Sequence, residues 1–349
     1  MYPRGIAPSN RFRVEQFIPY WEKMGVTLAY YAYYSLDEYK IIHRNGHLAA
    51  KVLYTLFGYI RQVVNAVIAA KHDAVFIQRS AAPIGPPVLE WFIVNVFRKP
   101  IIYDFDDAIW IKDPSTPPGL EILKSYSQVE KLCKWAKVAI GGNAYLANYA
   151  SNFSKKVRLI PTVVDTQGRY LPRKAQSKSD TVVVGWTGSH STLKYLLIVK
   201  DVLTKLIGHH QIAIKIIANK RPDFNGVDYS FATWNESTEI EELQTIDIGI
   251  MPLYEDPWSE GKCGFKAIQF MALGIPVVAS PVGMNKELID EGINGYLAKT
   301  NEEWFQMLSQ LILDDDLRYT MGQLARSKVV NNYSIQSVLP QWKELFESL

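Results

Sequence analysis

Short apolar segments alternate with longer segments of helical periodicity along the whole chain, and this alternation restricts the possible folds more than any other feature. Apolar runs of roughly four to eight residues are typical of strands buried on both faces. In the first half we expect strands at residues 26–33, 74–78, 100–103, 138–141 and 157–160. Helical patterns lie around them, at 13–24, 47–72, 86–96, 121–135 and 144–151. Strands that alternate with helices predict an α/β fold with parallel sheets and helices on both faces.

The same alternation starts again after a polar segment. Residues 166–180 (TQGRYLPRKAQSKSD) contain a proline and few apolar residues, which is typical of a linker. Beyond it we expect strands at 181–186, 211–218, 228–234, 247–252, 275–280 and 294–297. A chain of 349 residues also exceeds the usual length of one domain. We therefore predict two domains of similar build, with a boundary after residue 170.

Cysteine content and hydropathy indicate in which cellular compartment the protein is located. The two cysteines, Cys133 and Cys263, lie far apart and form neither a disulfide framework nor a metal-ligand cluster, which favours a reducing compartment. Charged residues interrupt the longest apolar segment near the start, so no run of about 18 apolar residues is available to span a bilayer. The first residues also lack a signal-peptide pattern. We expect a cytoplasmic protein.

Charge is distributed unevenly along the chain. Residues 1–170 hold 21 Lys and Arg against 13 Asp and Glu, whereas residues 171–349 hold 17 against 22. A basic first half is compatible with anionic lipid as a partner. It is equally compatible with an uneven distribution of surface charge that has no function. Aromatic and basic residues gather at 30–61, which suggests a peripheral membrane contact. No signature of a nucleic-acid-binding module is present.

The expected strand at 181–186 leads into a loop of small residues. Small side chains let the backbone turn tightly and expose N–H groups, and the following helix N-terminus favours a phosphate. Ligands of parallel sheets bind at such carboxyl ends. The alternative is an ordinary capped turn, because Ser and Thr cap helices in any case. The candidate phosphate-binding residues are Gly185, Thr187, Gly188, Ser189 and Lys194.

Two lysines mark a second candidate site. Lys262 and Lys266 are four residues apart, so on one helix they would project from the same face. Gly261 and Gly264 would let the backbone approach a ligand. Paired lysines can neutralise a diphosphate leaving group, and this is electrostatic stabilisation of a transition state. The alternative is a solvated basic face.

Three carboxylates follow the expected strand at 100–103. Asp104, Asp106 and Asp107 are candidates for a base, for contacts to sugar hydroxyls or for a metal site. The alternative is the first turn of a helix, where Asp is favoured. No set of His ligands accompanies them, so we expect no metal. Walker A, G-x-S-x-G, H-E-x-x-H and opening G-x-G-x-x-G patterns are absent from the sequence.

Several of these segments together resemble the glycosyltransferases of family four. The most specific are residues 247–253 (DIGIMPL), 261–283 (GKCGFKAIQFMALGIPVVASPVG) and 294–297 (NGYL). The loop 185–192 (GWTGSHST) is similar to the one that opens the second domain of this family. Residues 103–110 (YDFDDAIW) and 142–146 (GNAYL) resemble its first domain. The resemblance extends over most of the chain.

The resemblance implies a GT-B fold, in which two Rossmann-like domains face a central cleft. The domains would be residues 1–170 on the acceptor side and 171–332 on the donor side, and the helix at 333–349 would return to the first domain. The chain begins at what resembles the loop after the first strand of the family, so we expect that strand to be missing. Two glutamates eight positions apart are frequent in the family, and Gly261 and Gln269 stand there in this chain. Glu260, one residue away, is a candidate replacement for the first glutamate.

The implied activity is retaining transfer of a hexose-type sugar from a UDP- or GDP-linked donor to a glycan or lipid-linked acceptor, without a cofactor or metal. Lys262 and Lys266 would stabilise the leaving diphosphate, while Asp106, Asp107 or His190 would contact sugar or acceptor. Further donor contacts are assigned to Gln269 and to the ends of two expected strands, Trp234 and Pro252. Two alternatives remain: a non-catalytic homologue that acts as a partner subunit, and a nucleotide-sugar epimerase.

Overall fold

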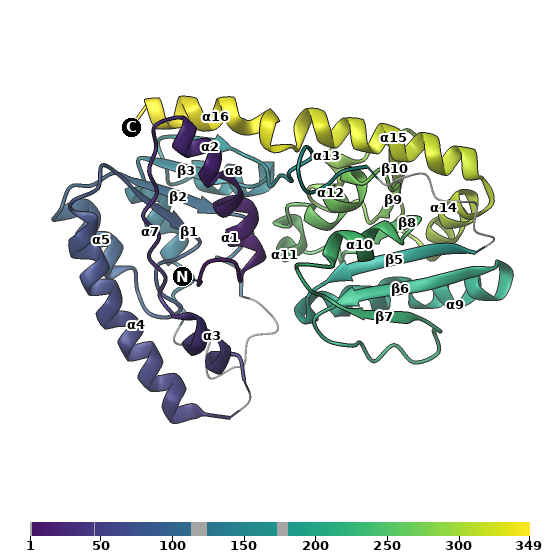
Figure 1. Cartoon of the computed structure of the whole chain (residues 1–349), viewed down its shortest axis with the longest axis horizontal. Coiled ribbons are helices and arrows are strands. Elements are labelled where there is room, and N and C mark those ends of the chain that lie inside the picture. The colour runs from purple at the N-terminus through teal and green to yellow at the C-terminus, as the bar shows by residue number, and fades with distance from the viewer. Residues whose placement is uncertain (1, 45, 113–123, 173–180) are drawn as a thin grey trace. The chain divides into compact units, whose positions relative to one another are not determined.

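The computed structural model describes the chain except for residues 1, 45, 113–123 and 173–180. Its contacts divide the chain into two compact units (Figure 1). Unit 1 contains Met1–Thr162 and Val338–Leu349, and unit 2 contains Val163–Ser337. Each unit is built on its own parallel sheet, which confirms the predicted α/β class. Part of the expected linker and the start of the helix expected at 121–135 lie outside the described residues.

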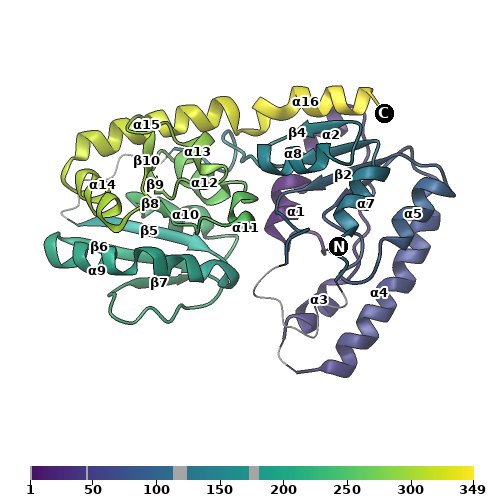
Figure 2. The same cartoon turned by 180° about the vertical axis from the view of Figure 1, so that it is seen from behind.

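Unit 1 has a four-stranded parallel sheet in the order β1-β2-β3-β4. Its strands are β1 (Val75–Gln78), β2 (Ile101–Phe105), β3 (Val138–Gly141) and β4 (Val157–Leu159). Its helices are α1 (Pro8–Arg13), η1 (Glu15–Phe17), α2 (Ile18–Lys23), α3 (Leu36–Ile42), α4 (Leu48–Ala69), α5 (Val88–Asn95), α7 (Gln128–Trp135) and α8 (Ala144–Ser151). In both Figure 1 and Figure 2, α4 runs along the outside of this unit with α5 beside it.

An aromatic cluster joins the two ends of the chain within unit 1. Trp342 of α16 (Ile335–Glu347) is fully buried, and its ring lies 4.9 Å from that of Trp21 and 5.5 Å from that of Phe17. Burial of several large aromatic rings is among the strongest stabilising contributions that a side chain makes. The cluster explains why the last helix packs with residues from the start of the chain rather than with unit 2, which precedes it.

Two sequence-based predictions for unit 1 are wrong. Residues 26–33 form no strand, and β1 is therefore an edge strand among the described residues. The expected helix at 13–24 is broken into α1, η1 and α2, because the φ of −131° at Val14 departs from helical geometry. Pro19 then stands in the first turn of α2, where its missing N–H costs no hydrogen bond.

Unit 2 has a six-stranded parallel sheet in the order β10-β9-β8-β5-β6-β7. Its strands are β5 (Val182–Gly188), β6 (Ile212–Ala218), β7 (Ser230–Thr233), β8 (Ile248–Met251), β9 (Val277–Ala279) and β10 (Gly295–Leu297). Its helices are η2 (His190–Val199), α9 (Lys200–His209), α10 (Glu239–Gln244), α11 (Pro257–Glu260), α12 (Phe265–Ala272), α13 (Asn285–Leu288), α14 (Asn301–Leu313) and α15 (Asp315–Asn332).

The strand order of unit 2 has a reversal beside β5. The chain leaves β5 toward β6 on one side, whereas β8 lies on the other side and leads away to β9. Right-handed crossovers in opposite directions put α9 and α12 on opposite faces of the sheet. Ligands of open α/β sheets bind at the carboxyl ends of the strands where the order reverses. The fold therefore directs attention to the ends of β5 and β8.

Candidate active site

The loop after β5 is held by its own hydroxyl groups. Thr187 is buried, and the Ser189 N–H donates to Thr192 Oγ1 at 3.2 Å. Thr192 Oγ1 in turn donates to the Ser189 carbonyl at 2.9 Å. A Cβ on Gly188 would lie 2.4 Å from the Trp186 ring, so only glycine fits there without movement. The loop is thus a fixed turn at the carboxyl end of a central strand.

Asn219 orients His190 at the carboxyl ends of β5 and β6. The His190 backbone N–H donates to Asn219 Oδ1 at 2.7 Å, and Asn219 Nδ2 lies 3.2 Å from His190 Nδ1. Asn219 follows β6, so the ends of two neighbouring strands are joined by one amide side chain. Sequence reasoning missed Asn219. Its position as the first polar residue after the apolar run 211–218 was the available signal.

Lys266 extends from α12 toward the end of β5. Its Nζ lies 4.6 Å from the centroid of the Trp186 ring, and Trp186 is buried in β5. An ammonium over the face of an indole is attracted by the ring and is held in place. The Lys194 Nζ lies in a similar way 5.4 Å from the ring of Tyr195. The structure therefore brings cationic groups from α12 and η2 to the residues around the phosphate-binding loop predicted from sequence.

Lys262 does not share a helix with Lys266, so the predicted common helical face is wrong. Lys262 lies in the turn between α11 and α12, and its Nζ is 5.1 Å from the Trp258 ring. The reason is Gly264, whose φ of +65° starts α12 only after this turn. A side chain at Gly264 would be strained in that conformation and would also contact Leu288.

Gly185 and Gln269 have structural explanations within unit 2. A Cβ on Gly185 would lie 2.3 Å from the side chain of Ile246, so this glycine permits close packing inside β5. The Gln269 amide is buried and donates to Tyr170 Oη at 2.7 Å and to Glu239 Oε1 at 3.1 Å. The Gln269 amide therefore has buried protein partners, and its expected contact to the donor stays a prediction.

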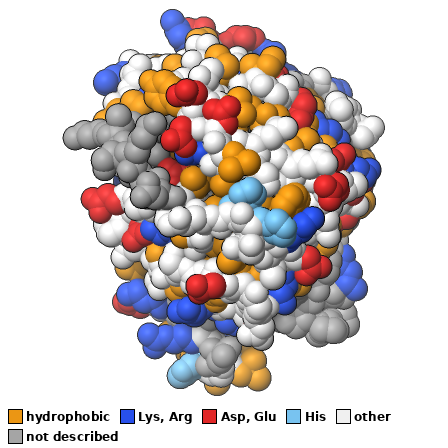
Figure 3. All heavy atoms as spheres, turned by 90° about the vertical axis from the view of Figure 1, so that its right-hand side faces the viewer, with side chains coloured by type: hydrophobic (Ala, Val, Ile, Leu, Met, Phe, Trp, Pro, Cys, Tyr) orange, Lys and Arg blue, Asp and Glu red, His pale blue; other side chains and the backbone are white. Residues whose placement is uncertain are grey.

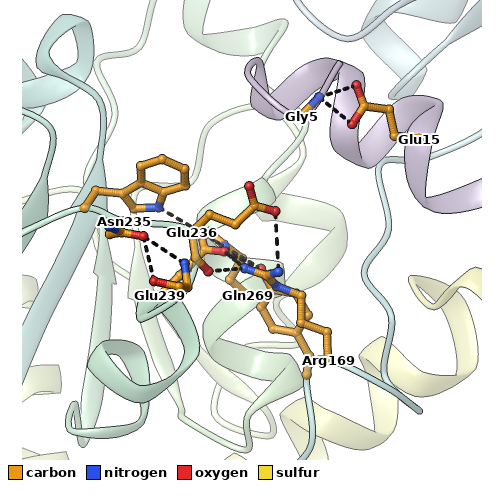
Figure 4. A network of polar contacts seen from close by, with 10 residues as sticks. Gly5, Glu15, Arg169, Asn235, Glu236, Glu239 and Gln269 are labelled. Carbon is orange, nitrogen blue, oxygen red and sulfur yellow. Dashed lines mark hydrogen bonds and ion pairs between the residues drawn. The ribbon is translucent and has the colours of Figure 1, made fainter. Parts of the chain in front are cut away.

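Glu239 is the centre of this buried network (Figure 4). Its carboxylate accepts hydrogen bonds from Trp234 Nε1 at 2.9 Å and from Arg169 at 2.9 Å, besides that from Gln269. Trp234, expected to contact the donor, thus uses its one ring N–H on Glu239. No motif in the sequence marked Glu239 or Arg169, because they are 70 residues apart and meet only in the fold.

The remaining predicted donor residues lie in the same unit. Pro252 is buried directly after β8, and Gly261 ends α11. Glu260, the candidate replacement for a family glutamate, accepts from the Gly283 N–H at 3.1 Å and from Lys286 Nζ at 3.3 Å. Its carboxylate is therefore engaged in holding the loop after β9.

The three aspartates predicted as site residues, Asp104, Asp106 and Asp107, are each paired with an arginine. Asp104 forms a buried ion pair with Arg13, whose Nη1 also donates to the Ile160 carbonyl at 2.7 Å. Asp106 accepts from Arg79 Nε at 2.6 Å, and Asp107 accepts from the same guanidinium. Arg79 has a left-handed backbone with φ of +61°, which aims its side chain back at these carboxylates. The predicted carboxylate cluster is thus neutralised by arginines. Among the described residues, no group of three or more His, Cys, Asp or Glu is arranged to hold a metal.

Replacing Asp106 with Asn tests this pairing through pH. Burial raises the pKa of Asp106, but Arg79, Ser9 and Arg13 together lower it by more, so the net pKa lies below the ordinary value. A lowered folded pKa stabilises the fold fully above the unfolded pKa, about 3.9. That stability is lost as pH falls through the folded pKa. We expect Asp106→Asn to lower the free energy of unfolding by about 1.5–3 kcal/mol near neutral pH.

The difference between wild type and Asp106→Asn should then shrink as urea denaturation is repeated from pH 6 down to about pH 3. A difference that stays constant over this range would show that the carboxylate charge contributes nothing. Asp37→Asn, at an exposed position of α3, is the matched control and should change stability by less than about 0.5 kcal/mol.

Unit 1 also contains a pocket of about 530 Å³. It lies between β1, the extended segment 24–34 and the inner face of α4, and its lining includes Trp21, Tyr30, Gln62, Phe76 and Phe346. The pocket runs along the edge of β1 where the predicted strand at 26–33 is not formed. None of the predicted site residues lines it.

Comparison with known proteins shows which proteins the chain resembles. Residues 182–314 match the family model described as glycosyl transferases group 1. The chain is 22% identical over 336 residues to an uncharacterized glycosyltransferase of Methanocaldococcus jannaschii, covering 90% of this chain and 76% of that protein. The Anabaena protein HepE, solved with UDP and glucose, superposes with a TM-score of 0.64 at 17% identity, covering 83% of this chain and 81% of that one. Residues 182–314 are thus similar to glycosyl transferases group 1, and the chain shares the GT-B fold of these structures.

Other relatives of this chain match shorter segments. A D-inositol 3-phosphate glycosyltransferase of Corynebacterium jeikeium is 33% identical over 105 residues, which is 30% of this chain and 24% of that protein. The chain thus spans about a quarter of the length of that relative. A sucrose-phosphate synthase from Thermosynechococcus elongatus has a TM-score of 0.64 at 15% identity over 83% of this chain and 77% of that one. At such identity the likeness to solved structures shows the fold.

Proposed function

We propose that the chain transfers a hexose-type sugar from a UDP- or GDP-linked donor to a glycan or lipid-linked acceptor, with retention of anomeric configuration. The observation that carries the proposal is the gathering of Lys266, the 187–192 loop and His190 at the carboxyl ends of β5 and β6. An ammonium group beside a fixed turn at the carboxyl ends of parallel strands is suited to a diphosphate. The Anabaena HepE structure, which holds UDP and glucose, supports a nucleotide sugar as donor.

The proposed mechanism rests on stabilisation of the negative charge that develops on the leaving group. As the bond between sugar and diphosphate breaks, negative charge grows on the leaving phosphate oxygen, and fixed donors aimed at that charge lower the barrier. Lys266 is assigned this role, with Lys262 and Lys194 as further cations and no metal required. Asp106, Asp107 and His190 remain the proposed contacts to sugar or acceptor. Donor contacts from Gly188, Ser189, Pro252, Gly261 and Gly264 remain proposals of the same kind.

The setting is also a proposal. We place the reaction in synthesis of surface polysaccharide or glycoconjugate, on the cytoplasmic side of a membrane to which the protein binds peripherally. Both cysteines are buried free thiols, which supports a reducing compartment. The alternatives of an epimerase or a non-catalytic subunit are less favoured, because the relatives described above are glycosyltransferases.

Thermal unfolding with a panel of nucleotides tests the donor. A ligand that binds only the folded state at 100 times its Kd adds about 2.7 kcal/mol to stability. For a unit of this size that corresponds to a rise in Tm of several degrees, at roughly 2–4 °C per kcal/mol. We expect UDP or GDP to produce this rise, and ADP and CMP at the same concentration to produce none. If neither UDP nor GDP at millimolar concentration raises the Tm, the proposed donor class is wrong.

A further inference from the structure

The helix α4 has its apolar face turned outward. Its buried positions are occupied by small or polar residues, namely Gly58, Gln62, Ala66 and Ala69. Its outward positions are occupied by large apolar side chains. These are Leu48, Val52, Leu53, Leu56, Phe57, Ile60, Val63, Val64 and Val67, each about half exposed or more. A surface helix of a soluble domain normally has the reverse arrangement.

The apolar surface continues onto α5. Val88, Trp91, Phe92 and Val96 are also exposed, and α5 packs beside α4. Isolated exposed apolar residues are ordinary, but a contiguous surface of this extent marks a binding site. By contrast, the face of the molecule in Figure 3 carries acidic and basic side chains interspersed among its hydrophobic ones. We call the outward residues of α4 and α5 the apolar face.

The helix is fixed to unit 1 along its inner side. A Cβ on Gly58 would overlap the ring of Tyr33, so the two elements touch closely. Arg61 donates to the Glu38 carboxylate at 3.0 Å, which ties α4 to α3. The expectation that no segment could span a bilayer is wrong for α4, which by length and composition alone would be able to cross one, because an 18-residue window of this helix holds at most two charged residues. Because its inner side is packed against the unit, a position in the plane of a membrane surface fits these contacts better than a span does.

The charges around the apolar face are basic. Residues 40–72 contain Lys40, Arg44, Lys51, Arg61 and Lys71 and no Asp or Glu. Two of these cations are neutralised by α3, since Lys40 pairs with Asp37 and Arg61 with Glu38. In the described part of the chain, Arg44, Lys51 and Lys71 form no ion pair. Lysines and arginines beside an apolar helix face that inserts into a membrane surface attract anionic lipid headgroups.

We propose that the apolar face of α4 and α5 docks onto a membrane surface that contains anionic lipid. The inference deepens the proposed function, because a lipid-linked acceptor would then be met at the surface that the enzyme binds. An amphipathic helix of this kind inserts its apolar side chains at the boundary of headgroups and acyl chains. The basic residues that flank it would make binding stronger at low salt, since exposed charges are screened by salt.

Co-sedimentation of the full chain with vesicles tests the proposal. We expect retention on vesicles of phosphatidylcholine with phosphatidylglycerol at low salt, and several-fold weaker retention on phosphatidylcholine alone. The variant Leu56→Gln/Ile60→Gln/Val67→Gln changes three residues that are each more than half exposed, so its fold should be unaffected. It should lose at least 10-fold in vesicle binding. The matched control Ile293→Gln/Leu313→Gln/Tyr319→Gln changes equally exposed apolar residues in unit 2 and should bind as wild type does.

Three results would overturn the proposal. The first is no retention of wild type on anionic vesicles, and the second is unchanged retention of the α4 variant. The third is a dimer of wild type without lipid that the α4 variant converts to a monomer, because the face would then be an interface between copies. The nucleotide-dependent rise in Tm is measured on the same samples. If the wild type does not bind anionic vesicles but UDP or GDP raises its Tm, only the docking face is rejected. If the wild type binds the vesicles but neither nucleotide raises its Tm, only the proposed donor is rejected.

Discussion

Replacing Lys266 with Ala should lower turnover of the nucleotide-sugar donor by about 10²–10³-fold, the usual loss when one fixed donor to a developing charge is removed. The ammonium group lies over Trp186 at the end of β5, where a diphosphate would leave. The contact of this cation with the ring contributes about 0.5–1 kcal/mol to folding where it is partly exposed. The measurement is the rate of nucleoside diphosphate release from the donor that raises the Tm, with urea denaturation of the same variant.

The matched control is Lys205→Ala. Lys205 also lies over an aromatic ring, 4.1 Å from that of Phe305, but it stands on α9. Its removal should cost a similar small amount of stability and leave turnover unchanged. If Lys266→Ala and Lys205→Ala have the same turnover as wild type, the assignment of Lys266 to the leaving group is wrong.

Replacing Arg13 with Met should lower the free energy of unfolding by about 3–5 kcal/mol, which is typical when one partner of a buried ion pair is removed. Arg13 and Asp104 are 1% and 0% exposed, so the remaining carboxylate has no access to water. The Ile160 carbonyl would lose its partner as well. Urea denaturation near neutral pH measures the loss, and Arg4→Met, at an exposed position, should change stability by less than about 0.5 kcal/mol.

A double variant separates the contribution of the ion pair to stability from that of side-chain packing. Arg13→Met combined with Asp104→Leu removes both charges and leaves apolar side chains of similar volume, which is often close to neutral for a buried pair. We expect the double variant to be more stable than Arg13→Met alone. If the double variant loses as much free energy of unfolding as the two single variants together, the two residues do not interact energetically. The stabilising role assigned to the ion pair would then be wrong.

Most of the two sheets was predictable from the sequence. Strands such as β3 and β9 are short apolar runs buried on both faces. Runs of this length and composition are typical of the inner strands of a parallel sheet. The loop after β5 was also predictable, because small residues between a buried strand and a helix have few other conformations. Asn219 was the missing part, since a single polar residue after a strand carries no pattern of its own.

Other features depend on partners that sequence spacing does not show. Lys262 and Lys266 fit one helix by spacing, but Gly264 with its left-handed backbone separates them. Residues 26–33 have strand composition, yet a strand forms only where a neighbouring strand pairs with it. Glu239 lies in a polar segment and becomes a buried hub only when α10 meets Arg169. The outward orientation of the apolar face of α4 likewise depends on which side of the helix the unit packs.

The most direct test of a nucleotide-sugar site on unit 2 is amide hydrogen exchange of the full chain with and without saturating UDP or GDP. Bound ligand slows local opening where it contacts the backbone. We predict slower exchange in peptides that contain residues 187–192 and 252–266, at the ends of β5 and β8. A nucleotide-sugar site on unit 2 would be contradicted if exchange is unchanged in these peptides, or is slowed only around the unit 1 pocket at residues 26–31 and 75–80.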